Sequence, residues 1–184
     1  FNQSGILTTA VIADFAGNSL NDLVTGGLWE PVRLYEMEDG NLSEQTDEAN
    51  LEASRGWWYT ISAADLTGNG YMDIIAGNLG LNHTFKTSPE APFSLLAAAF
   101  DDTGRTDVLF TVYDSGRHYP FFGPFKLGQS IANYFDRISE PDEAAAAAAE
   151  QILPREKFRD ALLLQTDTFE SSIFMNNGGK SFDR

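Results

Sequence analysis

The sequence predicts an all-β fold built from repeats, and three observations support this prediction. Short apolar runs with strand-like alternation recur along most of the chain. An acidic loop that contains glycine follows several of these runs, in its clearest form at residues 65–73 and at residues 14–22. The loops return at a constant spacing, which is the signature of a repeat architecture. We therefore predict a partial β-propeller of about three four-stranded blades with a helical insertion.

The first predicted blade lies in the N-terminal quarter of the chain. Its strands are expected at residues 8–15, 22–27, 32–37 and 41–43. Asp39-Gly40 separates the last two runs and is a strong hairpin signal. Four short antiparallel strands in sequence form the unit of a propeller.

The pattern then restarts at residues 57–65 and 71–77. The offset from Asp14 to Asp65 is 51 residues, and the offset from Asp22 to Asp73 is again 51. A third copy has its strands at residues 93–100 and 108–113, around the loop 101–107. Only 34 residues separate Asp73 from Asp107, so the second unit is expected to have lost or rerouted part of its outer strands.

The pattern changes after residue 125. Residues 129–138 and 156–164 have apolar side chains at spacings of three and four, which predicts helices. Six alanines at 144–149 are typical of an exposed helix, or of positions whose side chains are unassigned. Residues 171–175 and the following Asn-Asn-Gly-Gly indicate a hairpin again. The predicted organisation is propeller blades at 1–125, a helical insertion at 126–165, and the start of a further blade at 166–184, as a fragment of a longer propeller that requires the rest of its ring.

Composition excludes several classes of function. The chain has 184 residues, 42% of them hydrophobic, and a formal net charge of −15. This acidity argues against nucleic acid and against anionic membranes as partners. Without cysteine there is no disulfide framework, thiol nucleophile or Cys-based zinc site. No apolar stretch is long enough to span a bilayer.

The second repeat carries residues that resemble the FG-GAP/VCBS repeat family of β-propellers, in particular large secreted bacterial proteins of the ASPIC/UnbV-associated type. The resemblance rests on Gly56-Trp57-Trp58, on Ala64-Asp65 with its loop, and on the run 77–82 (GNLGLN). It extends over nearly the whole chain and implies an exported, multi-bladed propeller with calcium loops between blade strands. It does not imply one activity, because related propellers act in adhesion, beside glycan-active enzymes and on outer membranes.

The resemblance also implies a ligand set for Ca²⁺, with side-chain oxygens at loop positions one, three, five and nine and a carbonyl oxygen at position seven. In the second copy these are Asp65, Thr67, Asn69, Tyr71 and Asp73. The first copy offers Asp14, Asn18, Leu20 and Asp22, and Ala16 lacks the oxygen of position three. The third copy offers Asp101, Thr103 and Asp107, with Ala99 at position one.

Calcium takes six to eight oxygen ligands, and its affinity rises with the charge and rigidity of the site. We therefore expect calcium chiefly at Asp65–Asp73. The alternative is that Asp and Asn cap these turns through their own side-chain hydrogen bonds, without an ion.

No catalytic residue is predicted. The two histidines, His83 and His118, have no sequence context that indicates a triad. His83 is expected to serve in a loop, and His118 is expected to be structural. Trp57 and Trp58 would face opposite ways in a strand, which favours packing between blades over a platform for sugars.

These patterns predict a non-catalytic, calcium-supported binding or scaffold module of an exported protein, which contacts a protein or a glycan. Two alternatives remain open: an accessory propeller of a larger carbohydrate-active enzyme, and a structural subunit of a surface or membrane-associated assembly. In each case the expected location is extracellular, on the cell surface, or in the outer membrane or periplasm.

Overall fold

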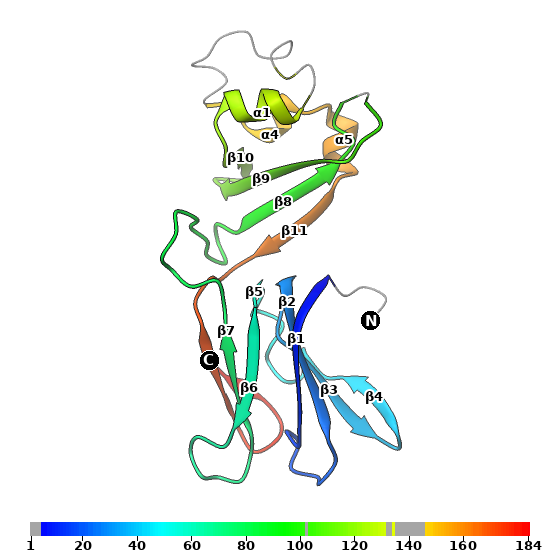
Figure 1. Cartoon of the computed structure of the whole chain (residues 1–184), viewed down its shortest axis with the longest axis vertical. Coiled ribbons are helices and arrows are strands. Elements are labelled where there is room, and N and C mark those ends of the chain that lie inside the picture. The colour runs from blue at the N-terminus through cyan, green and yellow to red at the C-terminus, as the bar shows by residue number, and fades with distance from the viewer. Residues whose placement is uncertain (1–4, 102, 132–133, 135–145) are drawn as a thin grey trace. The chain divides into compact units, whose positions relative to one another are not determined.

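The computed structural model describes residues 5–101, 103–131, 134 and 146–184 (Figure 1). The chain forms two compact units: unit 1 is Phe1–Thr84 with Thr166–Arg184, and unit 2 is Phe85–Gln165. The described residues form three antiparallel sheets and a few short helices. The prediction of a mainly β chain is therefore confirmed.

The first sheet of unit 1 is an antiparallel meander, as predicted for the first blade. Its strands are β1 (Ile6–Ala13), β2 (Asp22–Glu30), β3 (Arg33–Glu38) and β4 (Asn41–Glu44), and β5 (Gly56–Trp57) pairs with β2. Asp39 and Gly40 connect β3 to β4 with φ angles of 49° and 76°. Two successive positive φ values are those of the type I′ turn that suits a two-residue hairpin.

The second sheet of unit 1 has the order β13-β12-β7-β6. Its strands are β6 (Thr60–Ala64), β7 (Asp73–Gly77), β12 (Ser172–Asn176) and β13 (Phe182–Asp183). The sequence predicts that residues 166–184 begin a further blade, but β12 pairs with β7, with Phe174 opposite Ile74. The C-terminal residues therefore supply the third and fourth strands of the second sheet, and unit 2 is inserted between its second and third strands.

Unit 2 contains a third sheet, with the order β10-β9-β8-β11. Its elements are β8 (Phe93–Ala98), β9 (Asp107–Asp114), β10 (Arg117–Pro120), β11 (Leu162–Thr166), α1 (Pro124–Ser130), α4 (Ala149–Ile152) and α5 (Arg155–Arg159). The helix predicted at 156–164 ends at Arg159, because the apolar run that follows pairs as β11 at the edge of the sheet. Most of the helix predicted at 129–138, and residues 144 and 145, lie outside the described residues.

The repeat is visible in the register of the three sheets. The residue before each acidic loop lies opposite the aspartate that closes it: Ala13 opposite Asp22, Ala64 opposite Asp73, and Ala98 opposite Asp107. Each loop thus joins the first two strands of its sheet in the same frame.

The core of unit 1 fills the space between its two sheets. It contains Phe15, Val24, Val32, Leu34, Ala49, Leu51, Trp58, Ile61, Ile74, Ala76, Phe174 and Phe182. Trp58 is fully buried, donates its indole N–H to the Ser54 carbonyl at 3.0 Å, and meets Phe174 edge-on. The strand predicted at 57–65 is interrupted at Trp58, since β5 pairs with β2 and β6 pairs with β7. Trp57 instead packs against Trp29 and Phe169.

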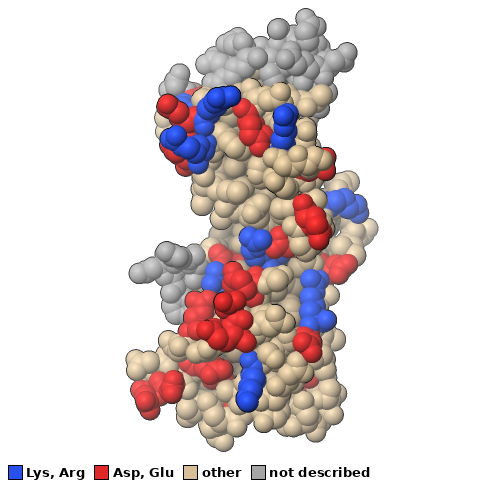
Figure 2. Space-filling model, turned by 180° about the vertical axis from the view of Figure 1, so that it is seen from behind, with Lys and Arg blue, Asp and Glu red and all other residues tan. Residues whose placement is uncertain are grey.

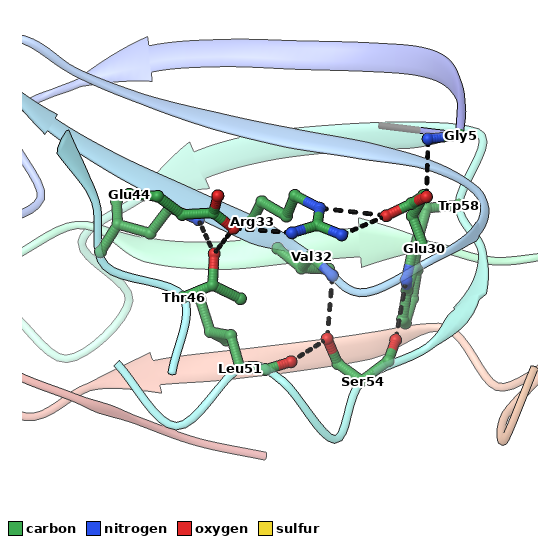
Figure 3. A network of polar contacts seen from close by, with 10 residues as sticks. Gly5, Glu30, Val32, Arg33, Glu44, Thr46, Leu51, Ser54 and Trp58 are labelled. Atoms are coloured by element: carbon green, nitrogen blue, oxygen red, sulfur yellow. Dashed lines mark hydrogen bonds and ion pairs between the residues drawn. The ribbon is translucent and has the colours of Figure 1, made fainter. Parts of the chain in front are cut away.

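A polar network braces the first sheet (Figure 3). The guanidinium group of Arg33 donates to Glu30 at 2.5 Å and to Glu44 at 2.6 Å, and so links three strands. Glu30 also accepts the Gly5 N–H at 2.6 Å. Burial acts to lower the pKa of Arg33, but these hydrogen bonds to Glu30 and Glu44 outweigh it and leave the pKa raised. Arg33 therefore stays charged at any accessible pH.

Unit 1 is expected to fold without the inserted unit. Gly80 donates its N–H to the Phe169 carbonyl at 2.8 Å, so the two ends of the gap are neighbours. Replacing residues 85–165 by a short Gly/Ser linker should leave a cooperative thermal transition in tryptophan fluorescence. All three tryptophans (Trp29, Trp57 and Trp58) lie in unit 1, so the signal reports that unit alone.

The control is removal of residues 166–184 from the intact chain. Loss of β12 and β13 removes the core side chains Phe174 and Phe182 and leaves one edge of β7 unpaired, so this variant should show no cooperative transition. A linker variant that unfolds, or a truncated chain that melts like the intact one, would contradict the pairing of β12 with β7.

Candidate functional site

The three acidic loops share one hydrogen-bond frame, built on the aspartate that closes each loop. The closing carboxylate accepts the backbone N–H seven residues earlier, at 2.9 Å in all three cases: Asp22 from Phe15, Asp73 from Leu66, and Asp107 from Phe100. Asp22 and Asp73 are fully buried, and Asp107 is 9% exposed. A buried carboxylate needs several donors to offset its desolvation, and the folded loop supplies them from the backbone.

The aspartate at position one accepts several backbone N–H groups of the turn that follows it. Asp14 accepts the N–H groups of residues 17, 18 and 19 at 2.7, 3.0 and 2.8 Å. Asp65 accepts those of residues 68, 69 and 70 at 2.7, 3.1 and 2.9 Å. In the third loop Ala99 stands at this position, and Asp101 accepts the N–H of Thr103 at 2.9 Å instead. The first two loops thus have the same hydrogen bonds to position one, whereas the third loop uses the aspartate at position three as the acceptor.

Positions four and five complete the frame. The glycine at position four has φ near +70° in the first two loops, 71° at Gly17 and 73° at Gly68. In the third loop Gly104, at position six, has a φ of 75°. Only glycine adopts this left-handed conformation without steric cost. A neighbouring side-chain oxygen in each loop accepts the backbone N–H two residues further on, at 2.8, 2.9 and 3.4 Å for Asn18, Asn69 and Thr103.

Each of the first two closing aspartates also accepts an N–H from the third strand of its sheet. Met37 of β3 donates to Asp22 at 3.0 Å, and Asn176 of β12 donates to Asp73 at 2.7 Å. The Asn176 side chain adds donations to the carbonyls of Phe15 and Met72, at 2.9 and 3.0 Å. Asn176 is not among the residues singled out from the sequence, because the following Asn-Gly-Gly indicates only a turn.

These contacts test how well the loops would hold calcium. A carboxylate has about four lone-pair sites. Both oxygens of Asp73 accept one N–H each, as do Oδ2 of Asp65 and Oδ1 of Asn69, whereas Oδ1 of Asp65 accepts two. The acceptor capacity that distinguishes the second loop therefore lies at Asp73. In the first loop, Oδ2 of Asp22 already accepts two N–H groups.

In the third loop, Oδ2 of Asp107 and Oδ1 of Asp101 likewise accept two hydrogen bonds each. Within the described residues, no group of three or more His, Cys, Asp or Glu is placed to hold a metal ion. The remaining predicted ligands lie around the loops: Thr67 and Leu20 are exposed, and Tyr71 is half-buried against Gly17. Among the three loops, the second therefore keeps the most acceptor capacity on its closing aspartate.

Electrostatics around the loops favour cations. The N–H of Gly70, and then those of the other loop residues, lower the pKa of Asp65. Burial raises the pKa of Glu36, and the neighbouring charges of Asp22 and Glu38 raise it further. Figure 2 shows acidic side chains gathered on one face of unit 1, with basic side chains more scattered. Such a field attracts divalent cations and repels polyanions.

Comparison with known families agrees with this geometry over part of the chain. Residues 14–76 match the family model of the FG-GAP-like repeat. This segment is about a third of the chain and runs from the first acidic loop almost to the end of β7. It thus contains one full repeat and both loops of unit 1. No curated protein matches the chain. In the part of the chain that the structure describes, no helix is long and apolar enough to cross a membrane.

The two histidines lie in packed surroundings. His83 contacts the Gly80 carbonyl at 2.6 Å and meets Phe169 edge-on. His118 is buried, contacts the Thr111 hydroxyl at 3.1 Å, and lies against Tyr113 and Phe158. Burial lowers the pKa of His118, although the charge of Glu150 acts to raise it. Both rings serve their own units as packing groups.

Substitution of a closing aspartate should destabilise unit 1. Asp73→Ala removes the acceptor of the Leu66 and Asn176 N–H groups, which should cost about 2–4 kcal/mol in the free energy of unfolding. Urea denaturation followed by tryptophan fluorescence measures this change. Asp47→Ala, at an exposed position, is the matched control and should stay within about 0.5 kcal/mol of the parent chain. Equal stability of the two variants would show that the closing carboxylate does not hold the loop.

Asp65 should make unit 1 sensitive to acid. Its pKa in the folded state is lowered from 3.8, so its contribution to stability is complete above about pH 5 and is lost as the pH falls through the lowered value. Asp65→Asn should therefore show a smaller fall in melting temperature between about pH 5 and pH 2 than the parent chain. An equal fall in melting temperature between about pH 5 and pH 2 for the variant and the parent would refute this role.

Proposed function

We propose that this chain is part of a β-propeller-type module of an exported or cell-surface protein, and that the module binds a protein or glycan partner without catalysing a reaction. The observation that carries the proposal is the strand–loop–strand unit, which occurs three times in the same register. The match of residues 14–76 to the FG-GAP-like repeat supports it, because such repeats occur in extracellular and surface proteins and typically mediate binding. A repeated blade with its core between sheets forms a rigid scaffold that presents surface loops.

The proposal includes calcium in the second loop. Asp65, Thr67, Asn69, the Tyr71 carbonyl and Asp73 would hold the ion, with water completing the ligand set. When bound, the ion would supply a further link across the loop and so stabilise the folded state by mass action. The chain's own contribution is the backbone frame, which orients the carboxylates of Asp65 and Asp73 without the ion.

Calcium should raise the melting temperature of unit 1. For an affinity typical of extracellular modules, about 10 mM calcium contributes roughly 1–3 kcal/mol. Asp65→Asn should abolish the shift, whereas Asp14→Asn, the equivalent change in the first loop, should retain it. Thermal unfolding with calcium and with a chelator, together with calorimetric titration, measures both effects. An absence of heat and of any shift in the parent chain would remove calcium from the proposal.

The binding role is tested by a glycan array, combined with a screen of exported proteins from the source organism. We expect saturable binding to one ligand class, at a surface formed by the folded repeats. Asp73→Ala should weaken this binding, because its destabilised loop lowers the fraction of folded repeats. Hydrolysis of a bound glycan by the chain would instead favour a catalytic role and overturn the proposal.

A further inference from the structure

A pocket in unit 2 lies beside the start of β10 and the helices α4 and α5. Its volume is about 530 Å³, and its walls include Arg117, Glu150, Gln151, Arg155 and Phe158. This volume is within the range of sites for small molecules, roughly 300–1,000 Å³. None of its described lining residues belongs to the acidic loops, so a ligand bound there would contact a different part of the chain from calcium.

Glu150 gives the pocket an unused acceptor. Its Oε1 accepts the backbone N–H of His118 at 3.1 Å. Its Oε2 is buried and has no hydrogen-bond partner among the described residues. A buried carboxylate oxygen without a donor is costly. A bound molecule with a hydroxyl group would supply that donor.

Two arginines provide positively charged hydrogen-bond donors at the same pocket. Arg117 and Arg155 both line it, and neither forms an ion pair with another described residue. The guanidinium group recognises carboxylates through paired hydrogen bonds. Gln151 accepts the Ala148 N–H at 2.9 Å through its side-chain oxygen, which leaves its amide NH₂ as a further donor.

The charges of the lining residues select the kind of ligand. Because burial lowers the pKa of His118, the neighbouring imidazole is neutral near pH 7. The described lining residues then carry two positive charges and one negative charge, a net charge of one positive. A monoanion with separate hydroxyl donors complements this set, whereas a zwitterion leaves the excess positive charge unmatched. Phe158 adds an apolar wall suited to the C–H face of a sugar ring.

We propose that this pocket binds a monoanionic sugar of the hexuronate type. The carboxylate pairs with Arg117 and Arg155, a ring hydroxyl donates to Oε2 of Glu150, and the ring lies against Phe158.

The test uses the whole chain and D-glucuronate as the probe, with calorimetry or saturation-transfer NMR as the readout. D-Glucuronate should bind saturably at millimolar concentration, and D-glucose should bind at least about tenfold more weakly. Arg155→Gln should weaken glucuronate binding about tenfold or more. Arg159→Gln is the matched control in the same helix, since Arg159 pairs with Asp160 and does not line the pocket, and it should leave binding unchanged.

Glu150→Gln separates recognition of the hydroxyl from attraction of the carboxylate. The parent chain should prefer D-glucuronate to cyclohexanecarboxylate, and the variant should lose that preference while it still binds both acids. Circular dichroism confirms that each variant is folded. Lack of saturable glucuronate binding by the parent chain, equal binding of glucose, equal effects of Arg155→Gln and Arg159→Gln, or an unchanged preference in Glu150→Gln would each overturn the proposal.

Discussion

The structure of unit 1 depends on buried carboxylates that are held by backbone N–H groups. Asp22 and Asp73 each stand at the first residue of a second strand and accept donors from the preceding loop and from the third strand. A buried carboxylate is costly in any conformation that does not supply these donors. The need for donors therefore fixes the loop conformation and the alignment of three strands together. Since a shift of one residue would turn every core side chain outward, the aspartate also determines which face of each sheet is buried.

The same constraint accounts for the discontinuous second sheet. Met37 follows Asp22 closely in sequence, whereas Asn176 reaches Asp73 only after the whole of unit 2 has been inserted. Asp73 needs a donor at that position wherever it comes from in the chain, and the C-terminal hairpin provides it. Asn176 then contributes more than a backbone N–H. Its amide group binds the carbonyls of Phe15 and Met72, and thereby joins the loops of the two sheets.

The parts of the fold that the sequence predicts well are those with local causes. The Asp39-Gly40 turn, the three acidic loops and the meander of β1 to β4 all rest on contacts between residues close in sequence, so pattern and spacing reveal them. The partner of β7 is not predictable in this way, because its pairing spans about a hundred residues and leaves no local signal. The apolar run at 162–164 suits a helix or a strand equally, and only the free edge of β8 decides between them. The ligand set proposed for calcium comes from a resemblance, and a sequence pattern does not reveal how many lone pairs the backbone already occupies.

The number of hydrogen bonds that each carboxylate accepts distinguishes those that maintain turns from the one that lines the pocket in unit 2. In the loops, Asp14 and Asp65 each accept three backbone N–H groups, so these side chains chiefly maintain the turn. Glu150 accepts one N–H and keeps a buried oxygen without a donor among the described residues, in a pocket that two arginines also line. The abundance of acidic residues makes the sequence poor at telling these roles apart, because every carboxylate looks alike until its donors are counted. By that count, the loops are structural elements with residual capacity for a cation, and the unmet acceptor in unit 2 is the stronger indication of a ligand.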